Sequence, residues 1–139
     1  MLLFSGIDVS TPMKLGIVLP IASMSGTSQL LLVLTFVFGF VAVNLYSAAV
    51  DQVTPWFPPQ FRGSSMGVAL DKLIWERSFP AQARRNYLLS TGLAAVAMLC
   101  AGTLLYLEGQ FVAALWFGAL FVSGIGYAFR RALQYKDRL

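Results

Sequence analysis

The chain has 139 residues, of which 58% are hydrophobic and 12% are charged, and its formal net charge is +4. A soluble domain averages about a quarter charged residues, and a soluble domain of this length cannot bury so much apolar surface. The composition therefore excludes a soluble globular domain. It also excludes a disordered chain, which would be polar. We expect an all-α integral membrane protein.

Two counts exclude whole classes of chemistry. The sequence has no histidine, which is the commonest metal ligand and the usual general base near neutral pH. It has one cysteine, Cys100, which rules out an internal disulfide or a cysteine-rich metal site, and an apolar run surrounds it. The six carboxylates are scattered, and there is no glycine-rich phosphate loop. We therefore predict a protein that is not an enzyme, with no catalytic residue, no metal and no cofactor.

Residues 1–28 are predicted to form an arm on the external side of the membrane. Lys14 and the apolar stretch 15–22 look like the start of a weak signal peptide, with small residues after them. Pro20 interrupts this stretch, however, and a true span follows almost at once. We interpret the arm as containing a short interfacial or re-entrant piece, with cleavage as the alternative.

Three stretches are predicted to cross the membrane, because each contains no Asp, Glu, Lys or Arg: residues 29–50, 86–107 and 109–129. A hydrocarbon core of about 30 Å needs about 20 helical residues, and one central charge would cost a few kcal/mol. Between the second and third stretches, only Glu108, Gly109 and Gln110 are plainly polar or flexible. So short a connection predicts that the last two spans form an antiparallel hairpin.

Residues 51–85 form the only substantial segment between spans. The segment opens with the proline- and aromatic-rich run 55–59, and residues 66–78 follow with a helical pattern that has one imperfect apolar face. We predict an interfacial helix that lies on the membrane surface and covers the span ends. The alternative is a docking element for a partner protein, anchored by three aromatic residues: Trp56, Phe57 and Trp75.

The basic residues predict the orientation. Nine of the ten lie in residues 51–85 and in the tail 130–139. The positive-inside bias places both segments in the cytoplasm and the N-terminus outside, in a bacterial inner membrane. Four arginines at span ends are expected to reach lipid headgroups: Arg84, Arg85, Arg130 and Arg131. Lipid explains these charges better than nucleic acid does, so we predict no nucleic-acid partner.

Within the spans, three residues are candidates for helix contacts. Asn44 needs a hydrogen-bond partner in lipid, either water or the hydroxyl groups of Ser90 and Thr91. Gly118 and Gly124 belong to small-residue patterns that favour close helix packing, within the chain or with another subunit. The phenylalanines at 36, 38 and 40 predict exposure to lipid, to a bound pigment or quinone, or to a partner helix.

One family resemblance concerns residues 30–107. These residues contain a span, a proline-rich juncture, a helix with an aromatic centre (residues 73–77), an Arg–Arg pair, and a second span that opens with Leu, Ser, Thr and Gly. This order of elements resembles universal stress protein B and similar small bacterial membrane proteins. The resemblance implies a stress-associated inner-membrane protein without catalytic residues. The third span and the N-terminal arm go beyond that family.

The sequence therefore favours a non-catalytic accessory or structural subunit of a larger inner-membrane complex, which contributes helix packing and a cytoplasmic docking loop. Its expected partners are the lipid bilayer and other membrane-protein subunits. The alternative is a self-assembling, holin-like pore, although a loop of this length is long for that class.

Overall fold

The computed structural model describes residues 23–61 and 66–139. The signal-like piece and most of the predicted N-terminal arm lie outside these residues. Within them the structure is helical and has no strand. Its elements are α1 (Gly26–Val53), η2 (Thr54–Trp56), η3 (Pro59–Phe61), α2 (Met66–Leu73), α3 (Ala81–Leu107), α4 (Phe111–Gln134) and η4 (Lys136–Arg138).

Three of these helices are long and apolar enough to cross a membrane. They comprise residues Gly26–Trp56, Ala81–Leu107 and Phe111–Gln134, with 31, 27 and 24 residues respectively. The prediction of an all-helical chain with three helices long and apolar enough to span a membrane is thereby confirmed for the described residues.

The long helices extend beyond the apolar stretches from which they were predicted. α1 begins at Gly26, where the Ser25 side chain accepts a hydrogen bond from the Ser28 amide, and α3 begins directly after Pro80. α4 continues past Arg130 and Arg131 to Gln134. A helix satisfies its own backbone hydrogen bonds whatever its side chains, so it continues until a cap or a breaker ends it. In contrast, α2 ends at Leu73, earlier than the predicted end at residue 78.

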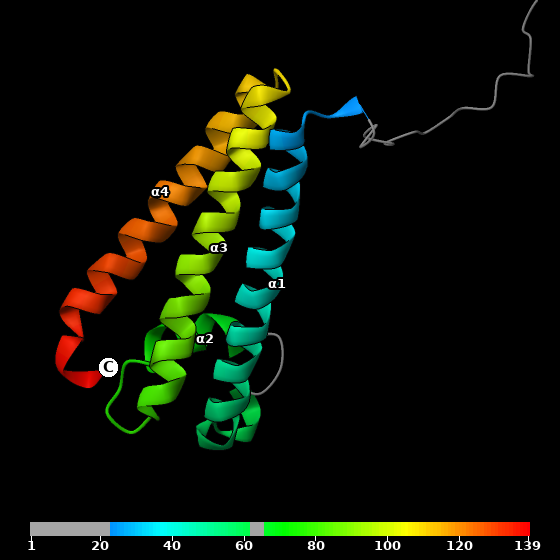
Figure 1. Cartoon of the computed structure of the whole chain (residues 1–139). Helices are drawn as coiled ribbons and strands as arrows, with labels where there is room; N and C mark the ends of the chain where they lie inside the picture. The colour runs from blue at the N-terminus through cyan, green and yellow to red at the C-terminus, as the bar shows by residue number, and fades with distance from the viewer. Residues whose placement is uncertain (1–22, 62–65) are drawn as a thin grey trace, which may run out of the picture.

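α3 lies at the centre of the bundle and packs against both α1 and α4 (Figure 1). α1 and α4 begin at the end where Glu108–Gln110 connect α3 to α4; we call this the turn end. We call the opposite end of the bundle the basic end. It contains the end of α1, the start of α3, and α2. Gly109 adopts a φ of 78°, a left-handed conformation that suits glycine, and this conformation ends α3 sharply.

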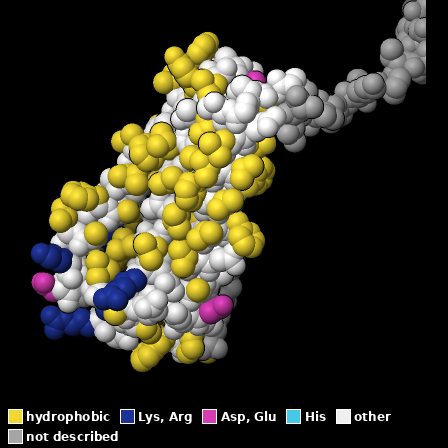
Figure 2. Space-filling model, viewed as in Figure 1, with side chains coloured by type: hydrophobic (Ala, Val, Ile, Leu, Met, Phe, Trp, Pro, Cys, Tyr) yellow, Lys and Arg dark blue, Asp and Glu magenta, His cyan; other side chains and the backbone are white. Residues whose placement is uncertain are grey.

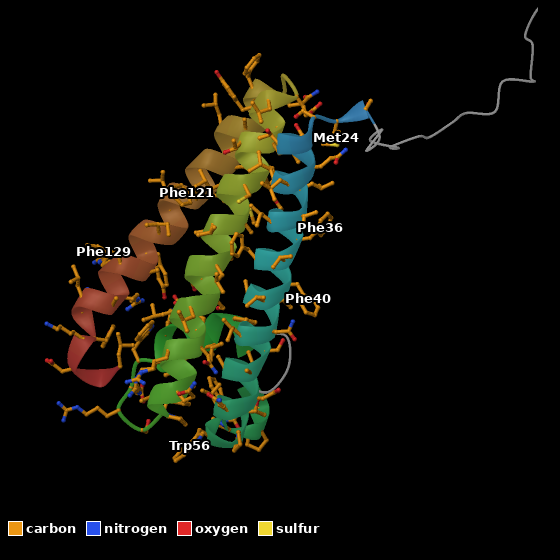
Figure 3. All side chains as sticks on the ribbon, viewed as in Figure 1. Met24, Phe36, Phe40, Trp56, Phe121 and Phe129 are labelled. Atoms are coloured by element: carbon orange, nitrogen blue, oxygen red, sulfur yellow. The ribbon has the colours of Figure 1, made fainter. Side chains whose placement is uncertain are left out.

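The size of the buried side chains differs between the long helices and the basic end. In the long helices many of the buried positions hold small residues, such as Ala42, Ala95 and Gly102. Large apolar side chains point outward, as Figure 3 shows for Phe36 and Phe40, which are 70% and 72% exposed. This pattern suits lipid, where small residues let helices approach and exposed apolar groups carry no penalty.

At the basic end, large side chains form a true hydrophobic core. The core is centred on Phe57, Leu70, Ile74, Trp75 and Phe79, with Val53 and Ala83 from the adjoining ends of α1 and α3. We call the described residues 54–61 and 66–80 the cap, because they fold against these helix ends. The cap and the helix ends beside it form the candidate functional site.

Candidate functional site

Trp75 is the central side chain of the cap. It follows α2 in a tight turn, in which the amides of Ile74 and Glu76 donate to the carbonyls of Leu70 and Leu73. The indole is 2% exposed and stacks on the ring of Tyr135, with the ring centroids 4.8 Å apart and the planes 16° from parallel. The turn therefore directs Trp75 toward the residues that follow α4.

The guanidinium of Arg131 lies among three aromatic rings. Its Cζ atom is 5.5 Å from the Trp75 ring centroid, 5.3 Å from that of Tyr127 and 5.9 Å from that of Tyr135. Aromatic faces attract a cation, most strongly where water is excluded. Tyr127, Arg131 and Tyr135 are four residues apart, the first two in α4 and the third directly after it. They therefore share one face, and this face is turned toward the cap.

Asp71 on α2 completes this network. Its Oδ1 accepts hydrogen bonds from the hydroxyls of Tyr87, at 3.1 Å, and of Tyr127. Its Oδ2 lies 4.0 Å from the Arg131 Nη2. One carboxylate thus connects the cap to both α3 and α4, so the network fixes the cap on the span ends.

Two further arginines bind main-chain oxygens. Arg84, which is 6% exposed, donates from Nη1 to the carbonyls of Glu76 and Phe79, at 3.0 and 2.7 Å. These bonds close the turn between α2 and α3. The exposed Arg85 donates from Nη2 to a main-chain oxygen of Leu139, at 3.0 Å.

The structure separates the three aromatic residues that were predicted to anchor a partner. Phe57 and Trp75 are each 2% exposed and pack in the chain's own core, whereas Trp56 is 58% exposed at the basic end (Figure 3). The sequence prediction treated the loop as an open surface. The structure differs because the loop has enough large apolar side chains to build a core.

The four arginines predicted at lipid headgroups are likewise divided. Arg85 and Arg130 are exposed, as a headgroup contact requires. Arg84 and Arg131 also contact the protein itself: Arg84 donates to two carbonyls and lines a polar cavity at the basic end, and Arg131 contacts aromatic rings and a carboxylate. The sequence could have indicated the aromatic surroundings of Arg131, because Tyr127, Arg131 and Tyr135 share a helical spacing of four.

The candidates for contacts between spans also have different environments. Asn44 donates to the carbonyl of Phe40 in its own helix, at 2.8 Å, and not to α3. Ser90 and Thr91 both donate to the carbonyl of Tyr87. Short polar side chains in a helix can satisfy themselves on the preceding turn, and this local bond replaces the bond predicted between helices.

Of the two predicted glycines, Gly124 marks a close helix contact. A Cβ at Gly124 would lie 3.0 Å from the Cβ of Ala95 on α3, whereas a Cβ at Gly118 would meet no atom within 4 Å. The sequence reasoning missed Gly102, where a Cβ would lie 3.1 Å from that of Phe117. Helical spacing shows which residues share a face, but not which face meets a neighbour.

The turn end carries a smaller polar contact that the sequence did not predict. The buried Ser28 hydroxyl donates to Glu108 Oε1 at 2.9 Å and so joins the start of α1 to the connection between α3 and α4. Near this end an apolar groove of about 430 Å³ lies between α3 and α4, lined in part by Gly102, Phe111 and Gly118. Among the described residues, no group of three or more His, Cys, Asp or Glu side chains could hold a metal ion.

No protein-family model, curated protein or solved structure matches this chain. The resemblance to universal stress protein B over residues 30–107 therefore stays a prediction, and functional inference rests on the geometry of the chain itself.

Proposed function

We propose that this protein is a non-catalytic accessory subunit of a larger complex in the bacterial inner membrane. In this proposal the three long helices cross the bilayer, α3 and α4 form an antiparallel hairpin, and α2 lies at the cytoplasmic surface as part of the cap. The N-terminus is outside and the C-terminus is in the cytoplasm. The cap is the docking element for a partner subunit.

The observation that supports this proposal most is the folded surface of the cap. Trp75 and Arg131 fix the cap on the span ends, while Trp56 stays exposed together with Lys72 and Arg77. A surface that is ordered before binding loses little conformational entropy when a partner docks, and aromatic residues and arginine dominate interface energetics.

Charge supports the proposed orientation. On the visible face in Figure 2, Lys and Arg side chains gather at the basic end, and apolar side chains cover much of the length of the bundle. An excess of positive charge is typical of the cytoplasmic side of a bacterial inner-membrane protein.

The exposed face of α4 is apolar and so does not suit the lining of a pore. Leu115, Trp116 and Val122 are all exposed on α4, and such a face suits lipid or another apolar helix. A water-filled pore needs a polar lining, so a pore is the competing outcome of the test below.

The test is purification of the tagged full-length protein from its native membrane in mild detergent. We expect an unrelated membrane subunit in constant stoichiometry with the wild-type chain, and a loss of that subunit in Trp56→Ala. Trp116→Ala is the matched control: it removes an equally large exposed indole from α4, and it should retain the subunit.

Two results would contradict the proposal. Loss of the subunit in Trp116→Ala but not in Trp56→Ala would move docking from the cap to the spans. Recovery of homo-oligomers alone, together with dye leakage from liposomes that contain the protein, would favour the pore.

A further inference from the structure

A second cavity at the basic end has a different character from the apolar groove. Its volume is about 460 Å³, and polar and charged residues dominate its lining. The lining comes from three segments: Arg77 from the turn before α3, Arg84 from the first turns of α3, and Gln134, Tyr135 and Asp137 from the end of α4 and beyond. The volume lies within the range of small-molecule sites, about 300–1,000 Å³.

The cavity is built on a rigid wall. Arg84 is held by its bonds to the carbonyls of Glu76 and Phe79, and Tyr135 is stacked on Trp75. The bond from Arg85 to Leu139 also ties the residues after α4 to the start of α3. A guanidinium that is fixed before binding loses less entropy when it meets an anion, and its planar donors match phosphate oxygens.

The position of the cavity favours a lipid as the ligand. The lining residues lie where α3 begins and α4 ends, and both helices are of spanning length. Phosphate groups of lipids lie at the same depth as the ends of spanning helices, where arginines attract them. A phosphate at this level is therefore present at high local concentration.

The charges of the lining favour a particular headgroup. Two guanidinium groups suit a phosphate, but the Asp137 carboxylate would repel a headgroup with only negative charge. A headgroup that has both a phosphate and a primary ammonium satisfies both signs, because the ammonium supplies three hydrogen-bond donors to a carboxylate. A quaternary choline has no such donor.

We infer that this cavity binds the headgroup of a phosphoethanolamine lipid. The phosphate lies against Arg77 and Arg84, and the ammonium lies against Asp137. This inference needs only the membrane location of the helices, so it stands apart from the proposed role as an accessory subunit.

The test is native mass spectrometry of the full-length protein in detergent, with equimolar phosphatidylethanolamine, phosphatidylglycerol and phosphatidylcholine that have identical acyl chains. We expect phosphatidylethanolamine to bind about tenfold more tightly than either competitor, as one lost charge-assisted contact implies. Tighter binding of phosphatidylglycerol, or equal binding of all three, would overturn the inference.

Three variants assign the two charges of the headgroup. Arg77→Gln should lower phosphatidylethanolamine binding about tenfold, while Lys72→Gln, which removes an exposed positive charge of the cap outside the cavity, should leave it unchanged. Asp137→Asn should remove most of the preference over phosphatidylglycerol. Far-UV circular dichroism confirms that each variant is folded, and equal losses of binding in Arg77→Gln and Lys72→Gln would contradict the assignment of the phosphate.

Competition with soluble phosphate compounds distinguishes a lipid phosphate from a free one. Neither inorganic phosphate nor glycerophosphoethanolamine at millimolar concentration should displace the bound lipid, because acyl chains add apolar contact. Displacement by inorganic phosphate would assign the cavity to a soluble anion and overturn the lipid assignment.

Discussion

The two ends of the helical bundle are held together by different interactions. At the basic end, Trp75 and its neighbours form a hydrophobic core, and Asp71 and Arg131 link the cap to α3 and α4. At the turn end, a hydrogen bond from Ser28 to Glu108 joins α1 to the α3–α4 connection, and an apolar groove lies nearby. Large apolar side chains gain most from packing inward where water is the alternative, because lipid solvates them about as well as protein does.

The largest effect is expected from the centre of the basic end. Trp75→Ala should lower the free energy of unfolding by about 3–5 kcal/mol, because it leaves a cavity in a packed core and removes the ring stacked on Tyr135. Far-UV circular dichroism during unfolding in mixed micelles measures the change. Trp56→Ala, at an exposed position, should change it by less than about 1 kcal/mol, and equal losses would contradict the comparison.

The polar network should contribute less than the core. Asp71→Ala removes the acceptor of two tyrosine hydroxyls and the ion-pair partner of Arg131, so we expect a loss of about 2–3 kcal/mol. The same unfolding assay applies. Glu76→Ala removes a carboxylate from the exposed face of the cap and should have almost no effect. A similar loss of unfolding free energy in both variants would show that the stability depends on the overall charge of the cap and not on the hydrogen-bonded network.

Replacing two glycines of α4 by alanine should change the free energy of unfolding in opposite directions. Gly124→Ala should destabilise the bundle by about 1–2 kcal/mol, because the new Cβ would lie 3.0 Å from that of Ala95. Gly118→Ala has open space and should stabilise the helix by about 0.5–1 kcal/mol. Thermal unfolding in detergent measures both. A stabilising Gly124→Ala would show that α3 and α4 pack less closely than described.

The smallest effect is expected at the turn end. Ser28→Ala should cost about 1 kcal/mol, because it removes the hydrogen bond to Glu108. Ser47→Ala, at an exposed position of the same helix, is the control. Pulsed hydrogen exchange at the start of α1 should show faster opening in Ser28→Ala alone. A loss as large as that of Asp71→Ala would remove the contrast between the two ends.

Much of the helical framework was predictable from the sequence. A run without charges predicts a spanning helix because the cost of a charge in lipid is a local property of each segment. Pro80 and Gly109 likewise mark helix boundaries through their own backbone restrictions. The exact ends were less predictable, since α4 continues through Arg130 and Arg131, which lie beyond its apolar stretch.

The candidate site was only partly predictable. The aromatic and basic residues of the loop were identified, but the alternative interpretation made Phe57 and Trp75 anchors for a partner, whereas they lie in the core. Whether an aromatic side chain faces inward depends on which distant segments pack around it. The same holds for Arg131, whose partners come from α2 and from the residues around it on α4.

The distribution of apolar and charged residues along the sequence by itself predicted three helices of spanning length, because hydropathy and charge act segment by segment. The tertiary structure alone decided which charged and aromatic residues serve the fold and which stay exposed. Arg84 and Arg85 are neighbours in the sequence, yet one is buried against two carbonyls and the other is exposed. That difference arises from the packing of the cap onto α3, which no local pattern specifies.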